Sequence, residues 1–202
     1  MKLKSTYLML SILVIVLFIN IGNLTAETIT FDEPRYVAVA GVHLYRGGPN
    51  TLIDPVSKLN FYVAYGEMYV TRVSHVGWYN YMLYFTPYYP SGTDPAGRVV
   101  ITFDELQQYV RIDVSTDGTP VHDNAYLRVS YYKDTNPENP IYTHDGPGEN
   151  IEYTDTQNGI KMLIVDTKYA ENNIEELEFY ELGQSSQTYP PSGVVALSNY
   201  SG

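Results

Sequence analysis

The residues best suited to chemistry lie in one aromatic segment, "GWYNYMLYFTPYYP", at residues 77–90. A flat aromatic ring can stack on the C–H face of a sugar while a neighbouring amide hydrogen-bonds its hydroxyl groups. In a strand, alternate side chains share a face, which places part of this segment on an outward platform. The predicted ligand-binding residues are Trp78, Asn80 and Tyr84, with Tyr88 and Tyr89 in the proline-rich loop that follows. The alternative is that Trp78 packs in the core and the tyrosines merely cover the sheet.

Carboxylates form a second candidate set, at opposite ends of the chain. In "ENNIEELEFYEL" (171–182), alternation places Glu175 on the apolar face of a predicted strand, where a carboxylate is costly unless it is paired or binds a metal. Near the other end, Glu27 shares a face with apolar residues and Asp32 follows shortly after. If the first and last strands are neighbours, these oxygens converge in a cluster of the kind that calcium prefers. The alternative is that all three are solvated acids.

No catalytic constellation is visible elsewhere. The histidines form neither H-x-H nor H-E-x-x-H, and the chain contains no G-x-S-x-G and no cysteine. Among 23 acidic residues, any pair of carboxylates could be nominated for glycoside hydrolysis, so such a pair carries no weight. The sequence therefore predicts a protein that is not an enzyme, with a secreted glycosidase as the third alternative.

These residues must be positioned by strands, because the apolar periodicity is two. The clearest alternation is in 58–65, 109–115 and 125–133; in the first of these, Leu59, Phe61, Val63 and Tyr65 share a face. Further strands are predicted near 28–32, 36–45, 68–73, 78–86, 98–103, 160–166 and 174–181, with turn-rich segments between them. About nine or ten short strands predict an all-β fold, an antiparallel β-sandwich of the jelly-roll type.

The pentapeptide "ITFDE" occurs twice, at 29–33 and 101–105. A tandem duplication should extend the similarity over most of its period, but little matches beyond the two copies. We therefore interpret the copies as two strands that each end in an acidic corner.

The ends of the chain differ in composition from the middle. Residues 1–26 combine two lysines, an apolar run and a final Ala26, the order typical of a secretory signal peptide; the alternative is an uncleaved membrane anchor. Residues 27–182 form the predicted β-sandwich domain. Residues 183–202 have no charged side chain and are rich in serine, proline and glycine, as in a tail or linker. Within this tail, "GVVALS" (193–198) is apolar enough to pair as a strand with this domain or with a neighbouring molecule.

The net charge limits the classes of molecule that we expect the protein to bind. The formal net charge is −11, and loss of residues 1–26 would make it −13 because two lysines and no acid lie there. Such acidity argues against nucleic acid and anionic lipid, since binding to phosphate rests on lysine and arginine. We expect a secreted protein, extracellular or on the cell surface, with no membrane insertion after signal cleavage.

The "ITFDE" opening, the "GVHLY" segment (41–45) and the closing "NNIEELEFYEL" resemble the galactose-binding-like jelly-roll domains. That superfamily includes calcium-dependent carbohydrate-binding modules and secreted bacterial or archaeal proteins. The resemblance covers roughly 27–182 and implies structural calcium between the first and last strands, at Glu175 with Asp32 or Glu27. The family usually has aspartate where this chain has Glu175, and the longer side chain would shift a ligand oxygen.

Together these observations predict a secreted, non-catalytic, calcium-stabilised β-sandwich that binds a polysaccharide or other glycan. The rival is a structural or adhesive subunit of a cell-surface layer or filament, self-associating by strand addition through the C-terminal tail.

Overall fold

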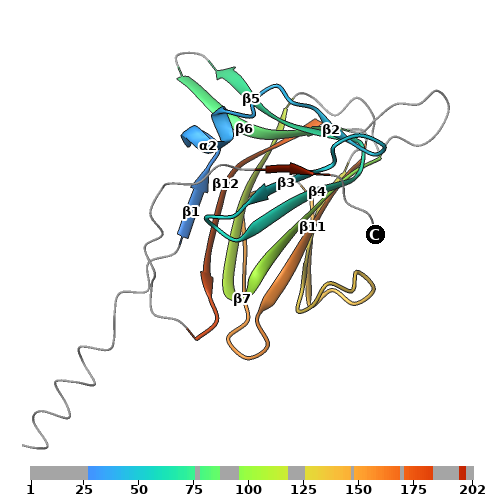
Figure 1. Ribbon diagram of the computed structural model, residues 1–202. Helices are drawn as coiled ribbons and strands as arrows, with labels where there is room; N and C mark the ends of the chain where they lie inside the picture. The colour runs from blue at the N-terminus through green and yellow to red at the C-terminus, as the bar shows by residue number, and fades with distance from the viewer. Residues whose placement is uncertain are drawn as a thin grey trace, which may run out of the picture.

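The computed structural model describes residues 27–75, 78–86, 96–117, 126–146, 148–168, 171–183 and 196–198. These form thirteen strands and one short helix (Figure 1). The elements are β1 (Glu27–Thr30), α2 (Pro34–Val37), β2 (Leu44–Tyr45), β3 (Thr51–Asp54), β4 (Leu59–Tyr65), β5 (Glu67–His75), β6 (Trp78–Thr86), β7 (Ala96–Asp117), β8 (Tyr126–Tyr132), β9 (Tyr142–Asp145), β10 (Gly148–Thr154), β11 (Ile160–Lys168), β12 (Glu171–Glu181) and β13 (Ala196–Ser198).

Strand β7 organises the molecule because its two ends belong to different halves of one antiparallel sheet. Its first part pairs with β4 and β11, which gives the order β13-β3-β4-β7-β11-β8-β9; we call this the first half-sheet. Its second part pairs with β12 and β10, which gives β2-β5-β6-β12-β7-β10, with β1 also beside β12; we call this the second half-sheet. The pairings of β7 with β11 and with β12 both shift register next to Gln107, where β7 passes from one half-sheet to the other.

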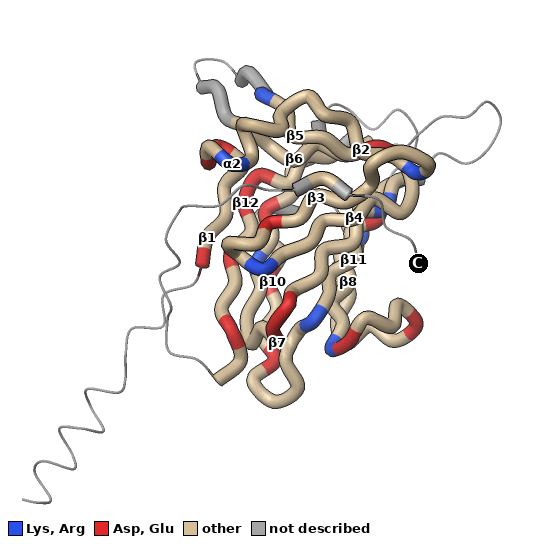
Figure 2. Tube along the Cα trace, in the orientation of Figure 1, with Lys and Arg blue, Asp and Glu red and all other residues tan. Residues whose placement is uncertain are grey.

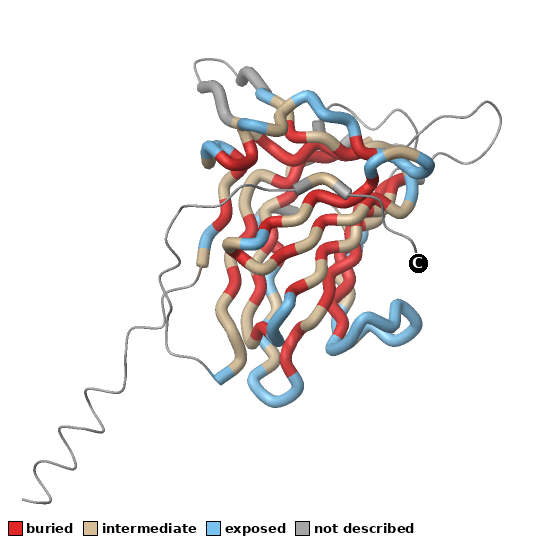
Figure 3. Tube along the Cα trace, viewed as in Figure 1, coloured by how far each residue is buried: buried red, intermediate tan, exposed pale blue. Residues whose placement is uncertain are grey.

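The two half-sheets pack face to face through alternate apolar residues, seen as alternating buried and half-buried positions along the strands (Figure 3). Phe103 of the first part of β7 meets Phe179 of β12, with ring centroids 5.2 Å apart. Phe61 of β4 meets Phe31, just after β1, at 5.9 Å. These edge-to-face pairs join opposite layers, as expected for a sandwich core. The all-β, antiparallel sandwich predicted from the sequence is confirmed.

Several element predictions were wrong in detail. The predicted strands 98–103 and 109–115 are one strand, β7, and strands β3, β9 and β10 lie outside every predicted strand. The predicted strand 36–45 is instead the end of helix α2, a turn and the two-residue β2, because Pro34 starts a helical turn there. The second "ITFDE" lies inside β7, so it does not end a strand, whereas β1 does stop within the first copy, at Thr30.

Segments near both ends of the chain pair as strands with the rest of the molecule. The first strand, β1, lies beside the last long strand, β12, with Ile29 opposite Leu177. Residues 196–198 of the predicted "GVVALS" segment form β13, which pairs with β3 of the same molecule. The proposed signal segment, 1–26, lies outside the described residues. Within the described part of the chain, no helix has the length and apolar character needed to cross a membrane.

Candidate functional site

The aromatic residues predicted to bind a ligand lie partly outside the described structure. Trp78 and Asn80 belong to β6, but the positions of their side chains are not described, and Tyr88 and Tyr89 fall in the undescribed segment 87–95. Tyr84 is only 9% exposed, and its ring centroid lies 5.0 Å from that of Tyr69 on β5. The expectation that Tyr84 points outward as an open platform is therefore corrected, since residues 82–85 are all buried.

The structure does not bring the three predicted calcium ligands together. The register of β1 and β12 places Glu27 opposite Phe179, four residues from Glu175 along β12. Asp32 accepts a hydrogen bond from the backbone N–H of Tyr81, at 2.8 Å. Among the described residues, no group of three or more histidine, aspartate and glutamate side chains is placed to hold a metal ion. This donor set therefore does not fit a calcium cage, which takes six to eight oxygens.

Glu27 instead lies near a buried ionic cluster that fastens α2 to β3. Arg35 Nε lies 3.1 Å from Asp54 Oδ2, and Arg35 Nη2 lies 2.9 Å from Glu33 Oε2. The hydroxyl of Tyr36 donates to the same Asp54 oxygen at 2.6 Å. Burial raises the pKa of Glu27 and of Glu33, although Arg35 opposes the shift in both. With Asp54 wholly buried, the cluster is a structural one.

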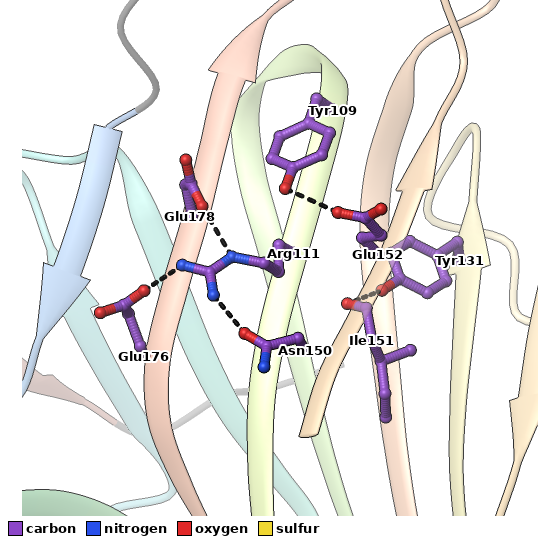
Figure 4. Close-up of polar contacts among 8 residues, drawn as sticks. All are labelled: Tyr109, Arg111, Tyr131, Asn150, Ile151, Glu152, Glu176 and Glu178. Atoms are coloured by element: carbon purple, nitrogen blue, oxygen red, sulfur yellow. Dashed lines mark hydrogen bonds and ion pairs between the residues drawn. The ribbon is translucent and has the colours of Figure 1, made fainter. Parts of the chain in front are cut away.

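The outer face of the second half-sheet carries another polar network (Figure 4). Arg111 on β7 donates to Glu176 and Glu178 of β12, the latter at 2.6 Å, and to Asn150 of β10. Beside it, the Tyr109 hydroxyl donates to Glu152 of β10. Burial, and to a smaller extent this hydrogen bond, raise the pKa of Tyr109 to about 12. Three acceptors on two flanking strands engage the guanidinium, so this network ties strands together and leaves little of the cation for a ligand.

A groove of about 890 Å³ lies on the outer face of the first half-sheet. Its floor is apolar: Val100, Met162 and Ile164 come from β7 and β11 and belong to a small hydrophobic cluster separate from the main core. One wall is formed by Thr135 and Pro137 of the loop between β8 and β9. The remaining lining residues belong to β3, β4, β7 and β11; they are Thr51, Ile53, Asn60, Tyr62, Ala64, Tyr65, Arg98, Thr102, Phe103, Asp104 and Lys161.

One row across this face alternates in charge. The strand registers place Tyr65, Arg98, Asp166, Arg128 and Asp145 side by side, one on each of β4, β7, β11, β8 and β9; we call this row the charge ladder. Arg98 donates to both oxygens of Asp166, at 2.6 and 3.0 Å, and these bonds raise the pKa of the guanidinium. Arg128 Nε donates to Asp145 at 2.5 Å.

The ring of Tyr65 completes the ladder at the groove. It is 51% exposed and lies 5.9 Å from the guanidinium carbon of Arg98. The sequence alternation had assigned Tyr65 to the core face with Leu59, but the pairing of β4 with β7 is interrupted between Val63 and Tyr65. This β-bulge moves Tyr65 out of the core. Asn60 and Tyr62, which alternate with Leu59, Phe61 and Val63 in the sequence, line the groove on the outer face.

The groove has the features that ligand binding requires: an apolar floor, aromatic rings and fixed hydrogen-bonding groups around the rim. The charged residues that line the groove are Arg98, Asp104 and Lys161.

No protein-family model and no curated protein sequence matches the chain. Among solved structures, the chain is similar to the K2 cleaved adhesin domain of Lys-gingipain, at 14% identity and a TM-score of 0.45. The alignment covers 76% of this chain and 98% of that domain. At these values the similarity carries no conclusion about function.

Proposed function

We propose that the protein is a non-catalytic, extracellular carbohydrate-binding β-sandwich and that its glycan lies in the groove of the first half-sheet. The observation that carries the proposal is the combination, in one groove of about 890 Å³, of an apolar floor and a half-exposed Tyr65. Tyr62 and Tyr65 offer rings for stacking, while Asn60 and Thr102 offer hydrogen bonds to hydroxyl groups.

The test is a glycan panel on the chain without residues 1–26, followed by calorimetry with each ligand that binds. Replacing Tyr65 by alanine should weaken binding about tenfold or more, because a stacking ring contributes on the order of 1–3 kcal/mol. The matched control is Tyr45→Ala, since Tyr45 is 46% exposed but belongs to β2 of the second half-sheet. Equal losses in the two variants would contradict the groove as the binding site. Repeating the titration with a chelator tests for calcium.

A second candidate function is assembly by strand addition, as the structural subunit of a surface layer or filament. The observation in its favour is that β13 pairs antiparallel with β3, with Ala196 opposite Ile53 and Ser198 opposite Thr51. The same pairing made between two copies would link them.

Deleting residues 183–202 distinguishes the two candidates. A strand-exchanging subunit should lose its oligomers in light scattering over a range of concentrations, whereas groove binding should persist. A full-length chain that stays monomeric at every concentration would rule out assembly.

A further inference from the structure

We infer that the groove accepts an uncharged polysaccharide segment and discriminates against polyanionic glycans such as polyuronates. This inference rests on the proposed function and deepens it by naming the chemical class of the ligand. It follows from the way in which the groove neutralises its own charges.

At one end of the groove, the Arg98 guanidinium is already paired with Asp166 of the protein itself. Arg98 uses Nε and Nη2 in a two-pronged contact with Asp166, the geometry in which guanidinium and carboxylate bind most specifically. The side chain of Asp166 is 17% exposed, so it is held in place rather than free in solvent. A ligand carboxylate could bind the same edge of Arg98 only by displacing Asp166.

At the other end, the second cation is held by a neutral backbone carbonyl. Lys161 Nζ donates to the backbone carbonyl of Asp104 at 2.6 Å, which holds the ammonium beside an acidic residue. Asn60 Nδ2 lies 3.5 Å from Asp104 Oδ1. The two cations and one anion that line the groove, together with Asp166 behind Arg98, leave no net charge at the site.

The surroundings add repulsion to this neutral lining. The chain carries a formal net charge of −11, with acidic residues spread over strands and loops (Figure 2). A polyanion would approach against this field, which is screened only beyond about 8 Å at physiological salt. An uncharged chain meets no such barrier, and its C–H faces suit the floor of Val100, Met162 and Ile164.

The experiment compares neutral oligosaccharides (glucan, mannan and xylan oligomers) with galacturonate and alginate oligomers of equal length. Binding is measured at about 20 mM and about 500 mM NaCl, conditions that differ strongly in screening. We expect a neutral oligomer to bind with less than about a twofold change between the two salt concentrations, and the uronates to bind at least about tenfold more weakly.

A variant tests the role of the ladder directly. Asp166→Asn should release the Arg98 guanidinium and increase uronate affinity about tenfold, because a charge-assisted hydrogen bond then becomes available. The control is Asp145→Asn, at the far end of the same ladder, where the side chain is 62% exposed and does not line the groove. Circular dichroism checks that both variants fold; if Asp166→Asn does not, the two salt conditions on the unmodified protein decide the question.

The failures can be told apart. Tight uronate binding that weakens with salt would overturn the inference of a neutral ligand and leave carbohydrate binding intact. Absence of binding to every glycan would overturn both the inference and the proposed function. Neutral binding with no gain of uronate affinity in Asp166→Asn would show that the ladder does not set the preference.

Discussion

At the scale of single residues, the buried carboxylate of Asp54 is the most constrained group. It is fully buried, pairs with Arg35 and accepts hydrogen bonds from Tyr36 and from the backbone N–H of Val56 at 3.0 Å. Asp54→Ala leaves the guanidinium buried without this partner, so we expect a loss of about 3–5 kcal/mol in the free energy of unfolding, measured in urea. Asp145→Ala, at an exposed ion pair, should cost less than about 1 kcal/mol.

Glu33 should make stability depend on pH. Burial, together with the charge of Asp54, raises its pKa above 4.5 in the folded protein, against the pull of Arg35. The native state therefore holds this proton more tightly than the unfolded chain. Its stabilising contribution is complete below pH 4.5 and is lost as the pH rises through the folded pKa.

The unmodified protein, compared with Glu33→Gln, should consequently have a greater relative stability at about pH 4 than at about pH 7 in urea titrations. Glu138→Gln, at an exposed position of the β8–β9 loop, serves as the control and should change little between the two pH values. A stability difference between the unmodified protein and Glu33→Gln that is the same at both pH values would contradict the assignment.

Tyr65 and Tyr84 show that the local sequence does not fix which face of a strand a side chain occupies. Strict alternation put Tyr65 in the core and Tyr84 on the surface, and the structure reverses both. For Tyr65 the reason is the β-bulge after Val63, which shifts the side-chain alternation by one position. A bulge is set by the partner strand, so the local sequence cannot place it.

At the scale of elements, the turn between β4 and β5 depends on Gly66. Its φ is +83°, and a Cβ atom there would overlap the carbonyl oxygen of Thr86. Gly66→Ala should therefore combine a backbone strain of about 1–2 kcal/mol with about 1–3 kcal/mol of steric overlap. Gly146→Ala is the matched control, because Gly146 also has a positive φ, of +120°, but no atom within 4 Å of the added Cβ. Thermal unfolding of both variants should show the larger loss for Gly66→Ala.

The strand pattern was predictable where alternation is strict and partners lie on both sides. The segments 58–65 and 78–86 coincide closely with β4 and β6, both interior strands of the sheet. Of the three strands that were not predicted, β9 and β10 are edge strands, each paired on one side only among the described residues. The third, β3, lies between β4 and β13 but has only four residues. Residues 104–106 carry exposed side chains in the middle of β7. They interrupt the apolar alternation in the sequence, although the backbone of the strand continues through them.

At the scale of the whole molecule, the candidate site depends on long-range strand order. The groove draws on β3, β4, β7 and β11 and on the β8–β9 loop, and its lining runs from Thr51 to Ile164, 113 positions apart in the sequence. The charge ladder exists only because five strands align Arg98, Asp166, Arg128 and Asp145 with Tyr65 in one row. No motif in the linear sequence marks such a row, whereas the all-β class follows from the local period of two.

Because β7 belongs to both half-sheets, the two layers should unfold together. Ile101 and Ile112 are fully buried in the two parts of β7, which pair with β4 and β12 respectively. Ile101→Val and Ile112→Val should each lower the free energy of unfolding by about 0.5–1.5 kcal/mol. A shared strand predicts one urea transition with an unchanged m-value in both variants, seen alike by far-UV and near-UV circular dichroism. Amide exchange in β4 and β6 should then accelerate to the same extent in either variant. If the half-sheets were independent units, each substitution would loosen only its own half, and two transitions would separate.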